Sequence, residues 1–312
     1  MTDTRRRVVR AGRQSSVKSV LRRRRTGVDA VDRSMDADIV PISDEESYAI
    51  AMLRKIPGVV DGHRNAGHVH ISTLLTGCLR KIAISEKFRI SVPSTIVNDS
   101  LGITFAQGHA IHDFVKNQFV RAHPDKMYGE WSCLCGETRT EPMVKADIPT
   151  RPCKSCHLIP SIYNEVGMVD EEHGIVGSPD VILYTADPGY YYVIEIKSIA
   201  HEQWKEIVRP KPDHVLQVVF YWYLMRKAGH NVPQYVSILY VTKGFNFKTP
   251  YKEFMVDPVS ELDRLSMYLD DATDLVMFRG GGPIPPRKMC SSAGCATAKQ
   301  CHVNTVCFNL PG

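Results

Sequence analysis

The sequence predicts a mixed α/β fold, and two observations support this prediction. Residues 181–185 (VILYT) and 190–196 (YYYVIEI) are rich in β-branched and aromatic residues, which favour strands, and Pro188-Gly189 between them is a strong turn signal. A helical segment then precedes another strand-like run at 235–242 (YVSILYVT). A helix between strands of one sheet indicates a mixed β-sheet flanked by helices.

The other elements follow from local signals. Ser43 and Glu46 form a capping-box pattern that opens a helix through Ile56. Residues 253–256 (EFMV) predict a strand, and 259–278 predict a final helix. At 312 residues the chain is long enough for one large domain with an insertion, or for two domains. We expect a basic, disordered arm over 1–40, a folded domain over 41–312, an inserted module over 129–160 and a cysteine-rich tail over 285–312.

The charge is distributed unevenly along the chain. The net charge is +5, yet residues 1–35 contain eleven Lys or Arg against three Asp, so this arm carries +8 and the remainder −3. Such an arm suits non-specific contact with nucleic acid, a solubility tail, or a segment upstream of a true start at Met35. No apolar run reaches the length of a membrane span, and the N-terminal arginines lack the apolar stretch of a signal peptide. The expected location is therefore the cytoplasm, of a bacterium or of a phage-infected host.

Three charged residues in the predicted hairpin are the first candidates for a functional site. A two-residue turn would place Asp180 opposite Lys197, and a four-residue loop would place it opposite Glu195. Either register puts all three on one face, roughly 5 to 8 Å apart at Cβ. Along the second strand this face is expected to hold the charge and the other face to be core. The alternative is an incidental surface cluster of charged residues.

Two neighbouring carboxylates and an amine suit a hard divalent cation. Like charges at this distance repel each other unless a cation lies between them. Mg²⁺ or Mn²⁺ accepts oxygen ligands from a few carboxylates and keeps several waters. Lys197 could then orient a water or neutralise a phosphate, which is the chemistry of phosphodiester hydrolysis.

The nine cysteines form two groups, and in a reducing compartment they indicate metal binding rather than disulfides. The first group comprises Cys133, Cys135, Cys153 and Cys156, two close pairs in the layout of a zinc ribbon, with His157 as an alternative ligand. The second comprises Cys78, Cys290, Cys295, Cys301 and Cys307. Four of these suit an iron-sulfur cluster, and a second zinc site in the tail with Cys78 as an ordinary thiol is the alternative.

Six motifs in order resemble the PD-(D/E)XK nucleases of the RecB type, in particular the iron-sulfur branch with the CRISPR-associated exonuclease, the AddB nuclease domain and phage-encoded relatives. They are Cys78 in STLLTGCLRKIA, expected in a helix, Gly108 and His112 in QGHAIHDFVKNQF, Gly177 to Asp180, Glu195-Ile196-Lys197, Gln217 and Tyr221 in HVLQVVFYWYL, and the tail cysteines. The resemblance covers about residues 70 to 308. It implies a restriction-endonuclease-like mixed sheet flanked by helices.

The resemblance also implies a role for each motif. His112, Asp180, Glu195 and the carbonyl of Ile196 would hold Mg²⁺ or Mn²⁺, Lys197 would position the attacking water, and Gln217 and Tyr221 would line the path of the DNA. Cys78, Cys290, Cys301 and Cys307 would hold a [4Fe-4S] cluster, with Cys295 as the alternate, because the spacing C-x4-C-x5-C-x5-C offers one cysteine too many. Glu165 matches an acidic position of the family weakly.

Apart from the resemblance, these residues are also compatible with purely structural roles. His112 lies on an amphipathic helix with Ile111, Val115 and Phe119, so it could be a buried structural histidine. Gln217 and Tyr221 share one face of a helix that we expect to begin with Asp213 as N-cap and to end at Gly229, and they could be satisfied core polar groups.

The predicted function is a metal-dependent deoxyribonuclease, an exonuclease acting on single-stranded ends in phage or host recombination, repair or DNA processing. The chain has no G-x4-G-K-[ST] phosphate loop, so any helicase motor would belong to a partner. The competing hypotheses are a non-catalytic, zinc-dependent nucleic-acid-binding protein and a sequence-specific endonuclease whose zinc module reads bases.

Overall fold

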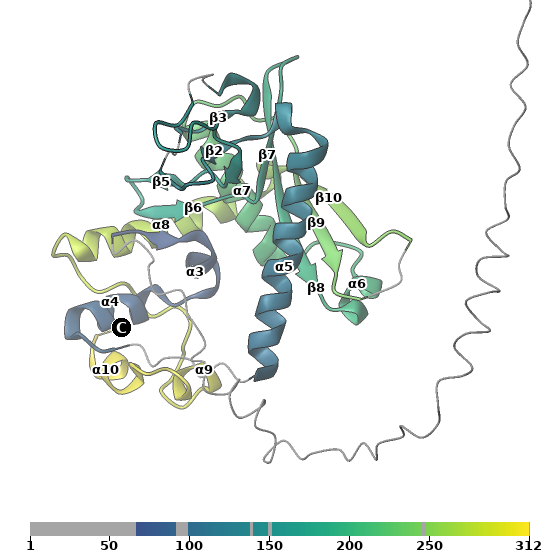
Figure 1. The fold of residues 1–312 in the computed structure, drawn as a ribbon. Coiled ribbons are helices and arrows are strands. Elements are labelled where there is room, and N and C mark those ends of the chain that lie inside the picture. The colour runs from purple at the N-terminus through teal and green to yellow at the C-terminus, as the bar shows by residue number, and fades with distance from the viewer. Residues whose placement is uncertain (1–66, 92–98, 138–139, 149–151, 245–247, 312) are drawn as a thin grey trace, which may run out of the picture. The chain divides into compact units, whose positions relative to one another are not determined.

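The computed structural model describes residues 67–91, 99–137, 140–148, 152–244 and 248–311 (Figure 1). The described residues all belong to one compact unit, which begins after Pro57. The predicted basic arm and the helix from Ser43 to Ile56 lie outside the described residues. Within the described part, no helix combines the length and the apolar character that a membrane span requires.

The core of the domain is a four-stranded mixed sheet. Its strands are β7 (Val181–Thr185), β8 (Tyr190–Ile199), β9 (Val236–Thr242) and β10 (Tyr251–Val256), in the order β10-β9-β8-β7. The β8–β9 pair is parallel and the outer pairs are antiparallel. Parallel strands need a crossover, which is supplied by α6 (His201–Glu206) and α7 (Pro212–Lys227). The predicted mixed α/β fold is therefore confirmed.

The register of the β7–β8 hairpin is the second of the two that the sequence allows. Val181 pairs with Ile194 and Thr185 with Tyr190, so the loop consists of the four residues 186–189. Extending this ladder by one position places Asp180 opposite Glu195. This register therefore places the carboxylates of the hairpin on neighbouring positions of the two strands.

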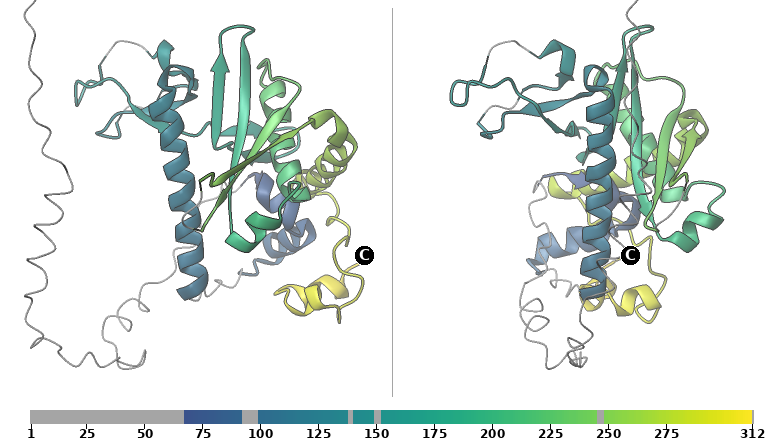
Figure 2. Two further views of the ribbon diagram at one scale, coloured as in Figure 1. Left: turned by 90° about the vertical axis from the view of Figure 1, so that its right-hand side faces the viewer. Right: turned by 45° about the vertical axis from the view of Figure 1, so that its right-hand side comes forward.

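Both faces of the sheet are core, which corrects the expectation that one face holds charge. Ile194 and Ile196 pack with Val115 of α5 (Asp99–Ala122) on one face. Val193 packs on the other face in the cluster that includes most of α7, and Figure 2 shows the sheet lying between α5 and α7. Glu195 is 3% exposed. The reason is that a parallel pair with a crossover helix is covered on both sides.

Helix α7 begins two residues earlier than predicted. Its N-cap is Lys211 and Pro212 occupies the first helical position, so Asp213 lies inside the first turn and is not the cap. Proline suits this position because its fixed φ is helical and its missing N–H would be unpaired there. The predicted end at Gly229 is confirmed, because Gly229 follows the helix with a φ of +85°.

A second sheet connects the N-terminal helices to this core. Its order is β1 (Val69–His70), β6 (Ile175–Gly177) and β5 (Met168–Asp170). The helices α3 (Ile71–Thr76) and α4 (Leu79–Phe88) follow β1. Cys78 is the N-cap of α4 and not an interior helix residue as predicted, because the chain turns at Gly77 between the two helices.

A third sheet overlaps the segment for which an inserted module is predicted. It contains β2 (Tyr128–Ser132), β3 (Met143–Val144) and β4 (Ile162–Asn164), in the order β3-β2-β4, with the short 3-10 helices η2 (Pro124–Lys126) and η3 (Lys145–Asp147) beside it. Trp131 is fully buried and anchors this module in the cluster that also contains Ile196.

The C-terminal region closes the domain on α4. The predicted final helix is divided into the 3-10 helix η4 (Pro258–Glu261) and α8 (Leu262–Arg279), and the tail then forms α9 (Ala296–Lys299) and α10 (Asn304–Asn309). Cys307 of α10 packs in one small cluster with Ile84 of α4. The two ends of the described chain therefore meet around α4 (Figure 1).

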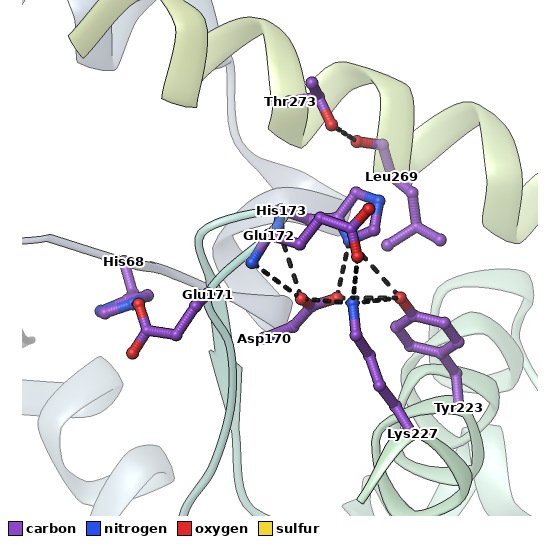
Figure 3. Close-up of polar contacts among 9 residues, drawn as sticks. All are labelled: His68, Asp170, Glu171, Glu172, His173, Tyr223, Lys227, Leu269 and Thr273. Carbon is purple, nitrogen blue, oxygen red and sulfur yellow. Dashed lines mark hydrogen bonds and ion pairs between the residues drawn. The ribbon is translucent and has the colours of Figure 1, made fainter. Parts of the chain in front are cut away.

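A buried carboxylate fastens the turn between β5 and β6 to α7 (Figure 3). Asp170 is 1% exposed. It accepts hydrogen bonds from Lys227 (2.7 Å) and Tyr223 (2.9 Å) and lies 2.7 Å from the His173 ring nitrogen. Asp170, Glu172 and His173 have the spacing of a metal site. Lys227 forms ion pairs with two members of this group, Asp170 and Glu172. We therefore interpret the group as a structural ion-pair network.

Candidate active site and cysteine clusters

The hairpin and two helices bring the predicted catalytic side chains together. Asp180, at the start of β7, accepts a 2.7 Å hydrogen bond from the backbone N–H of Ile196 through Oδ2. Its Oδ1 lies 3.4 Å from Nδ1 of His112 on α5. The two side chains are partly exposed, at 14% and 27% respectively. His112 is therefore a neighbour of the acidic pair rather than an isolated core histidine.

Two glycines of the predicted motifs permit this close approach. A Cβ on Gly177 would lie 2.5 Å from Ile71 and 2.8 Å from the Tyr221 ring. A Cβ on Gly108 would lie 3.3 Å from Ser198 Oγ of β8. Glycine thus lets the segment before Asp180 approach α7, and lets α5 approach β8 at the level of His112.

The remaining polar residues form one hydrogen-bonded chain. Lys197 Nζ lies 2.8 Å from Glu195 Oε1 and donates to Gln217 Oε1 at 2.8 Å. Gln217 Nε2 in turn donates to the Tyr221 hydroxyl at 2.8 Å. An ammonium group has three N–H donors, so two are used by these contacts and the third is available to a water or a phosphate oxygen.

The surroundings of Glu195 suit a bound cation. Its Oε2 is buried without a hydrogen-bond partner among the described residues. Burial, as the main cause, and the charges of Asp180 and Glu165 together raise the pKa of Glu195 to about 8, against the opposing effect of Lys197. A buried carboxylate with an unpaired oxygen, held beside other carboxylates, is costly unless a cation is bound.

Glu165 is a third carboxylate of this site, and the sequence indicates it weakly. It lies between β4 and β5, where burial raises its pKa, a hydrogen bond from Lys116 opposes this, and Asp180 adds to the rise. Lys116 Nζ is 2.8 Å from Glu165 Oε1. Lys116 lies one helical turn after His112 on α5. This spacing is the signal in the sequence that could have identified Lys116 as a neighbour of the site.

Lys197 lies between two open clefts. The larger, of about 630 Å³, is lined by basic and polar residues that include Lys197, Lys211, Lys243, His112, His201 and His214. The smaller, of about 300 Å³, is lined by residues that include Thr73, Lys197, Asp213, His214 and Gln217. Lys197 and His214 face both clefts, so the ammonium group is accessible although Glu195 is buried.

The donor set fits a hard divalent ion. Asp180, Glu195 and Glu165 offer carboxylate oxygens, and His112 offers a ring nitrogen. The bare Oε2 of Glu195 identifies an oxygen that such an ion would satisfy. The Ile196 side chain is fully buried with the α5 residues, and the predicted role of its carbonyl as a ligand stays a prediction.

The first cysteine group is assembled as predicted. Single ligand atoms of Cys133, Cys135, Cys153 and Cys156 lie within 4.8 Å of one another, and the sulfurs of Cys135 and Cys153 are 3.6 Å apart. Tetrahedral coordination with Zn–S bonds of about 2.3 Å separates the sulfurs by about 3.8 Å. The described ligand group consists of these four cysteines, without the alternative His157.

Four of the five remaining cysteines surround one small cavity. Cys78, Cys290, Cys301 and Cys307 line it. The Cys295 sulfur instead accepts a hydrogen bond from the Ala298 N–H at the start of α9. Burial raises the pKa of Cys290, as do the neighbouring thiols of Cys295, Cys78 and Cys301. This arrangement favours the predicted set with Cys295 as the spare residue, although Cys295 remains within reach.

A buried arginine contacts the cysteines of the tail. Arg80 is 2% exposed, and its Nε donates to the Cys307 sulfur at 3.3 Å. Its other donors bind the carbonyls of Pro285, Cys307 and Pro311. None of these described partners is a carboxylate. A buried cation is costly without a counter-charge, and cysteine thiolates bound to a cluster would provide one.

In the comparisons with known proteins, the matches come from solved structures. No family model and no curated protein matches the chain. Among solved structures, the alkaline exonuclease LHK-Exo from Laribacter hongkongensis matches with a TM-score of 0.38 and 13% identity, covering 69% of this chain and 93% of that one. A structure of LHK-Exo in complex with dAMP gives a TM-score of 0.38 and 14% identity. A protein from Eubacterium rectale named as an exonuclease matches with a TM-score of 0.38 and 14% identity over 83% of this chain and 93% of that one. Scores this low do not establish a common fold, so the function proposed below rests on the site.

Proposed function

We propose that the protein is a metal-dependent nuclease that hydrolyses phosphodiester bonds in DNA. The observation that carries this proposal is the buried, unpaired Oε2 of Glu195 beside Asp180, with Lys197 fixed at 2.8 Å on the same strand. A buried ion-pair network made for stability would satisfy that oxygen. A divalent ion held by the carboxylates would satisfy it.

The side chains divide the work of hydrolysis. Asp180, Glu195 and His112 would hold the ion, with the Ile196 carbonyl as a further ligand. A bound Mg²⁺ or Mn²⁺ would supply Lewis-acid activation of water and of the phosphate. Lys197 directs its third N–H toward the attacking water, and Gln217 restricts the ammonium group to that position.

Gln217 and Tyr221 have a supporting role in this proposal. The Tyr221 hydroxyl is buried and orients the Gln217 amide, whose oxygen then faces Lys197. Gln217 also lines the smaller cleft, where it could contact the strand. Positioning of the acting amine by a rigid amide reduces the freedom lost on reaching the transition state.

The substrate class follows from the resemblance to the RecB-type nucleases together with the open, basic cleft. We propose an exonuclease that acts on single-stranded ends in recombination, repair or DNA processing of a phage or its host, with a helicase or recombination protein as a possible partner. The zinc-ribbon-like module and the iron-sulfur tail would both be structural. A cluster that joins Cys78 to the tail cysteines would close a loop of more than two hundred residues and so stabilise the fold.

Three labelled substrates test the proposal. The protein is incubated with Mn²⁺ and a 5′-labelled single strand, a duplex or a closed circle. We expect shortening of the single strand and no cleavage of the circle. Cleavage of the circle would instead support the endonuclease alternative, and binding without cleavage would support the non-catalytic one.

Lys197→Ala identifies the active site in the same assay. We expect it to abolish cleavage and to leave DNA binding close to that of the parent. The matched control is Lys126→Ala, an exposed lysine of η2, which should cleave normally. Equal cleavage by Lys197→Ala and the parent would refute the assignment.

A further inference from the structure

We propose that His214 is a neutral hydrogen-bond donor to a phosphate oxygen of the bound strand, and that Tyr240 sets its tautomer. This inference rests on the proposed nuclease function and assigns a substrate contact that lies outside the predicted motifs. His214 is the residue of α7 one turn before Gln217, and its ring lines both clefts beside Lys197.

The hydrogen bonds around Tyr240 determine which ring nitrogen carries the proton. The Tyr240 hydroxyl oxygen accepts a 3.0 Å hydrogen bond from the backbone N–H of Lys211. It also lies 2.7 Å from Nδ1 of His214. Tyr240 is fully buried, so its O–H must have an acceptor, and His214 Nδ1 is the described atom that can serve. Nδ1 therefore accepts, and the neutral ring carries its hydrogen on Nε2.

The surroundings keep this ring neutral. Burial, as the main cause, and the charges of Lys197 and Lys211 together lower the pKa of His214 to about 4, against the opposing effect of Asp213. An imidazolium beside two ammonium groups would be repelled by both. A neutral ring offers its N–H without that repulsion.

The His214 side chain lines both clefts and is partly exposed. The His214 side chain is 17% exposed, and Nε2 is 3.8 Å from Asp213 Oδ2, which is longer than a hydrogen bond. The larger cleft beside it also presents Lys197, Lys211 and Lys243. A strand that places its scissile phosphate at Lys197 would therefore bring a neighbouring phosphate oxygen to His214.

Two substitutions separate the outward donor from the inward acceptor. The amide of His214→Asn occupies the position of Nδ1, so it keeps an acceptor for Tyr240 and removes the outward donor. The amide of His214→Gln reaches the position of Nε2 and keeps an outward donor. Binding is measured by fluorescence anisotropy of a fluorescein-labelled single-stranded oligonucleotide, with Ca²⁺ in place of Mg²⁺.

We expect His214→Asn to weaken binding by about tenfold or more, because a hydrogen bond to a charged acceptor is lost. His214→Gln should retain most of the affinity. Unchanged binding by His214→Asn, or equal losses in both variants, would overturn the proposal.

The salt dependence of binding tests whether the donor is neutral. Each cation that contacts a phosphate of a single strand contributes about 0.7 to the slope of log K against log salt. His214→Asn should therefore lower affinity at every salt concentration without changing the slope. Lys211→Gln, the charged neighbour, should reduce the slope. A reduced slope in His214→Asn would show an imidazolium contact and refute the neutral donor.

The role of Tyr240 is tested by measuring which ring nitrogen of His214 carries the proton. Long-range ¹H–¹⁵N spectra of histidine-labelled protein, assigned by the loss of one ring in His214→Asn, should show protonated Nε2 in the parent. Tyr240→Phe removes the O–H that Nδ1 accepts, so protonated Nδ1 should appear. An unchanged tautomer in Tyr240→Phe would exclude the positioning role.

These results are distinguishable from failure of the proposed function. A protein that cleaves no DNA but loses binding in His214→Asn would retain this contact and lose the nuclease assignment. A protein that cleaves DNA while His214→Asn binds normally would retain the nuclease assignment and lose this contact.

Discussion

The Oδ2 atom of Asp180 accepts a 2.7 Å hydrogen bond from the backbone N–H of Ile196. Strand β7 begins at Val181, so the β-ladder with β8 does not extend to Ile196, and the Asp180 side chain satisfies this N–H instead. The bond fixes one carboxylate against the strand segment that carries Glu195 and Lys197. The acidic pair is therefore held together by the backbone, before any ion is bound.

The stability of the metal-free protein should fall as the pH rises from about 5 to about 8. The folded pKa of Glu195 is raised to about 8 by burial, and its unfolded value is near 4.3. A carboxyl group with a raised folded pKa stabilises the fold below its unfolded pKa, and this contribution is lost as the pH passes through the folded one. The check is the Tm in EDTA across this range.

Divalent ions should raise the Tm more at pH 8 than at pH 6, because they bind the ionised carboxylate. Glu195→Gln should remove both the pH-dependent loss in EDTA and most of the gain from Mn²⁺. A Tm gain that is equal at both pH values, or that persists in Glu195→Gln, would place the ion elsewhere.

Gln217→Ala should slow cleavage by about ten- to a hundredfold, because Lys197 loses the acceptor that orients its ammonium group. Tyr221→Phe should have a smaller effect, since it removes a partner of Gln217 and leaves the contact with Lys197. Single-turnover rates at saturating Mn²⁺ measure the difference. The order of the two effects is the test, and a larger loss in Tyr221→Phe would contradict the proposed chain of contacts.

The inserted module should bind one zinc ion per chain. Cys156→Ser removes one thiolate of the four that lie within 4.8 Å, so zinc content measured by mass spectrometry should fall to near zero. His157→Ala is the control and should keep the metal. We expect local loss of structure in the module, detected by proteolysis, while the four-stranded sheet stays folded. Zinc retention in Cys156→Ser would refute the four-cysteine site.

The tail should hold an iron-sulfur cluster with Cys295 as the spare cysteine. Serine at Cys78, Cys290, Cys301 or Cys307 should remove the broad absorbance near 400 nm, whereas Cys295→Ser should retain it. Arg80→Met should also lower iron content, because it removes the hydrogen bond to the Cys307 sulfur. Protein reconstituted anaerobically with iron and sulfide that binds only zinc would contradict this prediction.

Asp170→Asn should destabilise the fold by about 2 to 4 kcal/mol, because it leaves Lys227 and Tyr223 facing a neutral amide in a buried site. The Asp170 pKa is lowered to about 2: burial alone would raise it, and the hydrogen bonds from Lys227, His173 and Tyr223 lower it by more. A lowered folded pKa gives stability that is present above the unfolded pKa and lost as the pH falls through the folded one.

Denaturant unfolding at pH 7 and at pH 3 gives the measurement for this variant. The parent should lose stability between these values, and Asp170→Asn should lose less. Glu171→Gln, at an exposed neighbour of the same turn, serves as the control. A difference between the parent and Asp170→Asn that is the same at both pH values would show that the charge of Asp170 is not the cause.

Several features of the site could be predicted because short-range rules decide them. The alternation of side chains along a strand places Glu195 and Lys197 on one face, and a spacing of four places Gln217 and Tyr221 together on α7. The short spacing within each of the two cysteine pairs likewise predicts that the four cysteines form one cluster. Local signals left two loop lengths open for the hairpin, and they placed the start of α7 two residues too late.

The sequence by itself determined the mixed sheet, the crossover helix and the types of residue that could bind metal, because strand and helix periodicity and turn chemistry act over a few neighbouring residues. Tertiary structure alone decided that Glu195 is buried with an oxygen unpaired among the described residues, that Glu165 lies nearby, that Arg80 reaches Cys307, and that the Tyr240 hydroxyl contacts His214. Each of these depends on contacts between elements far apart in the chain, where packing and desolvation, and not local propensity, set the charge and direction of a side chain.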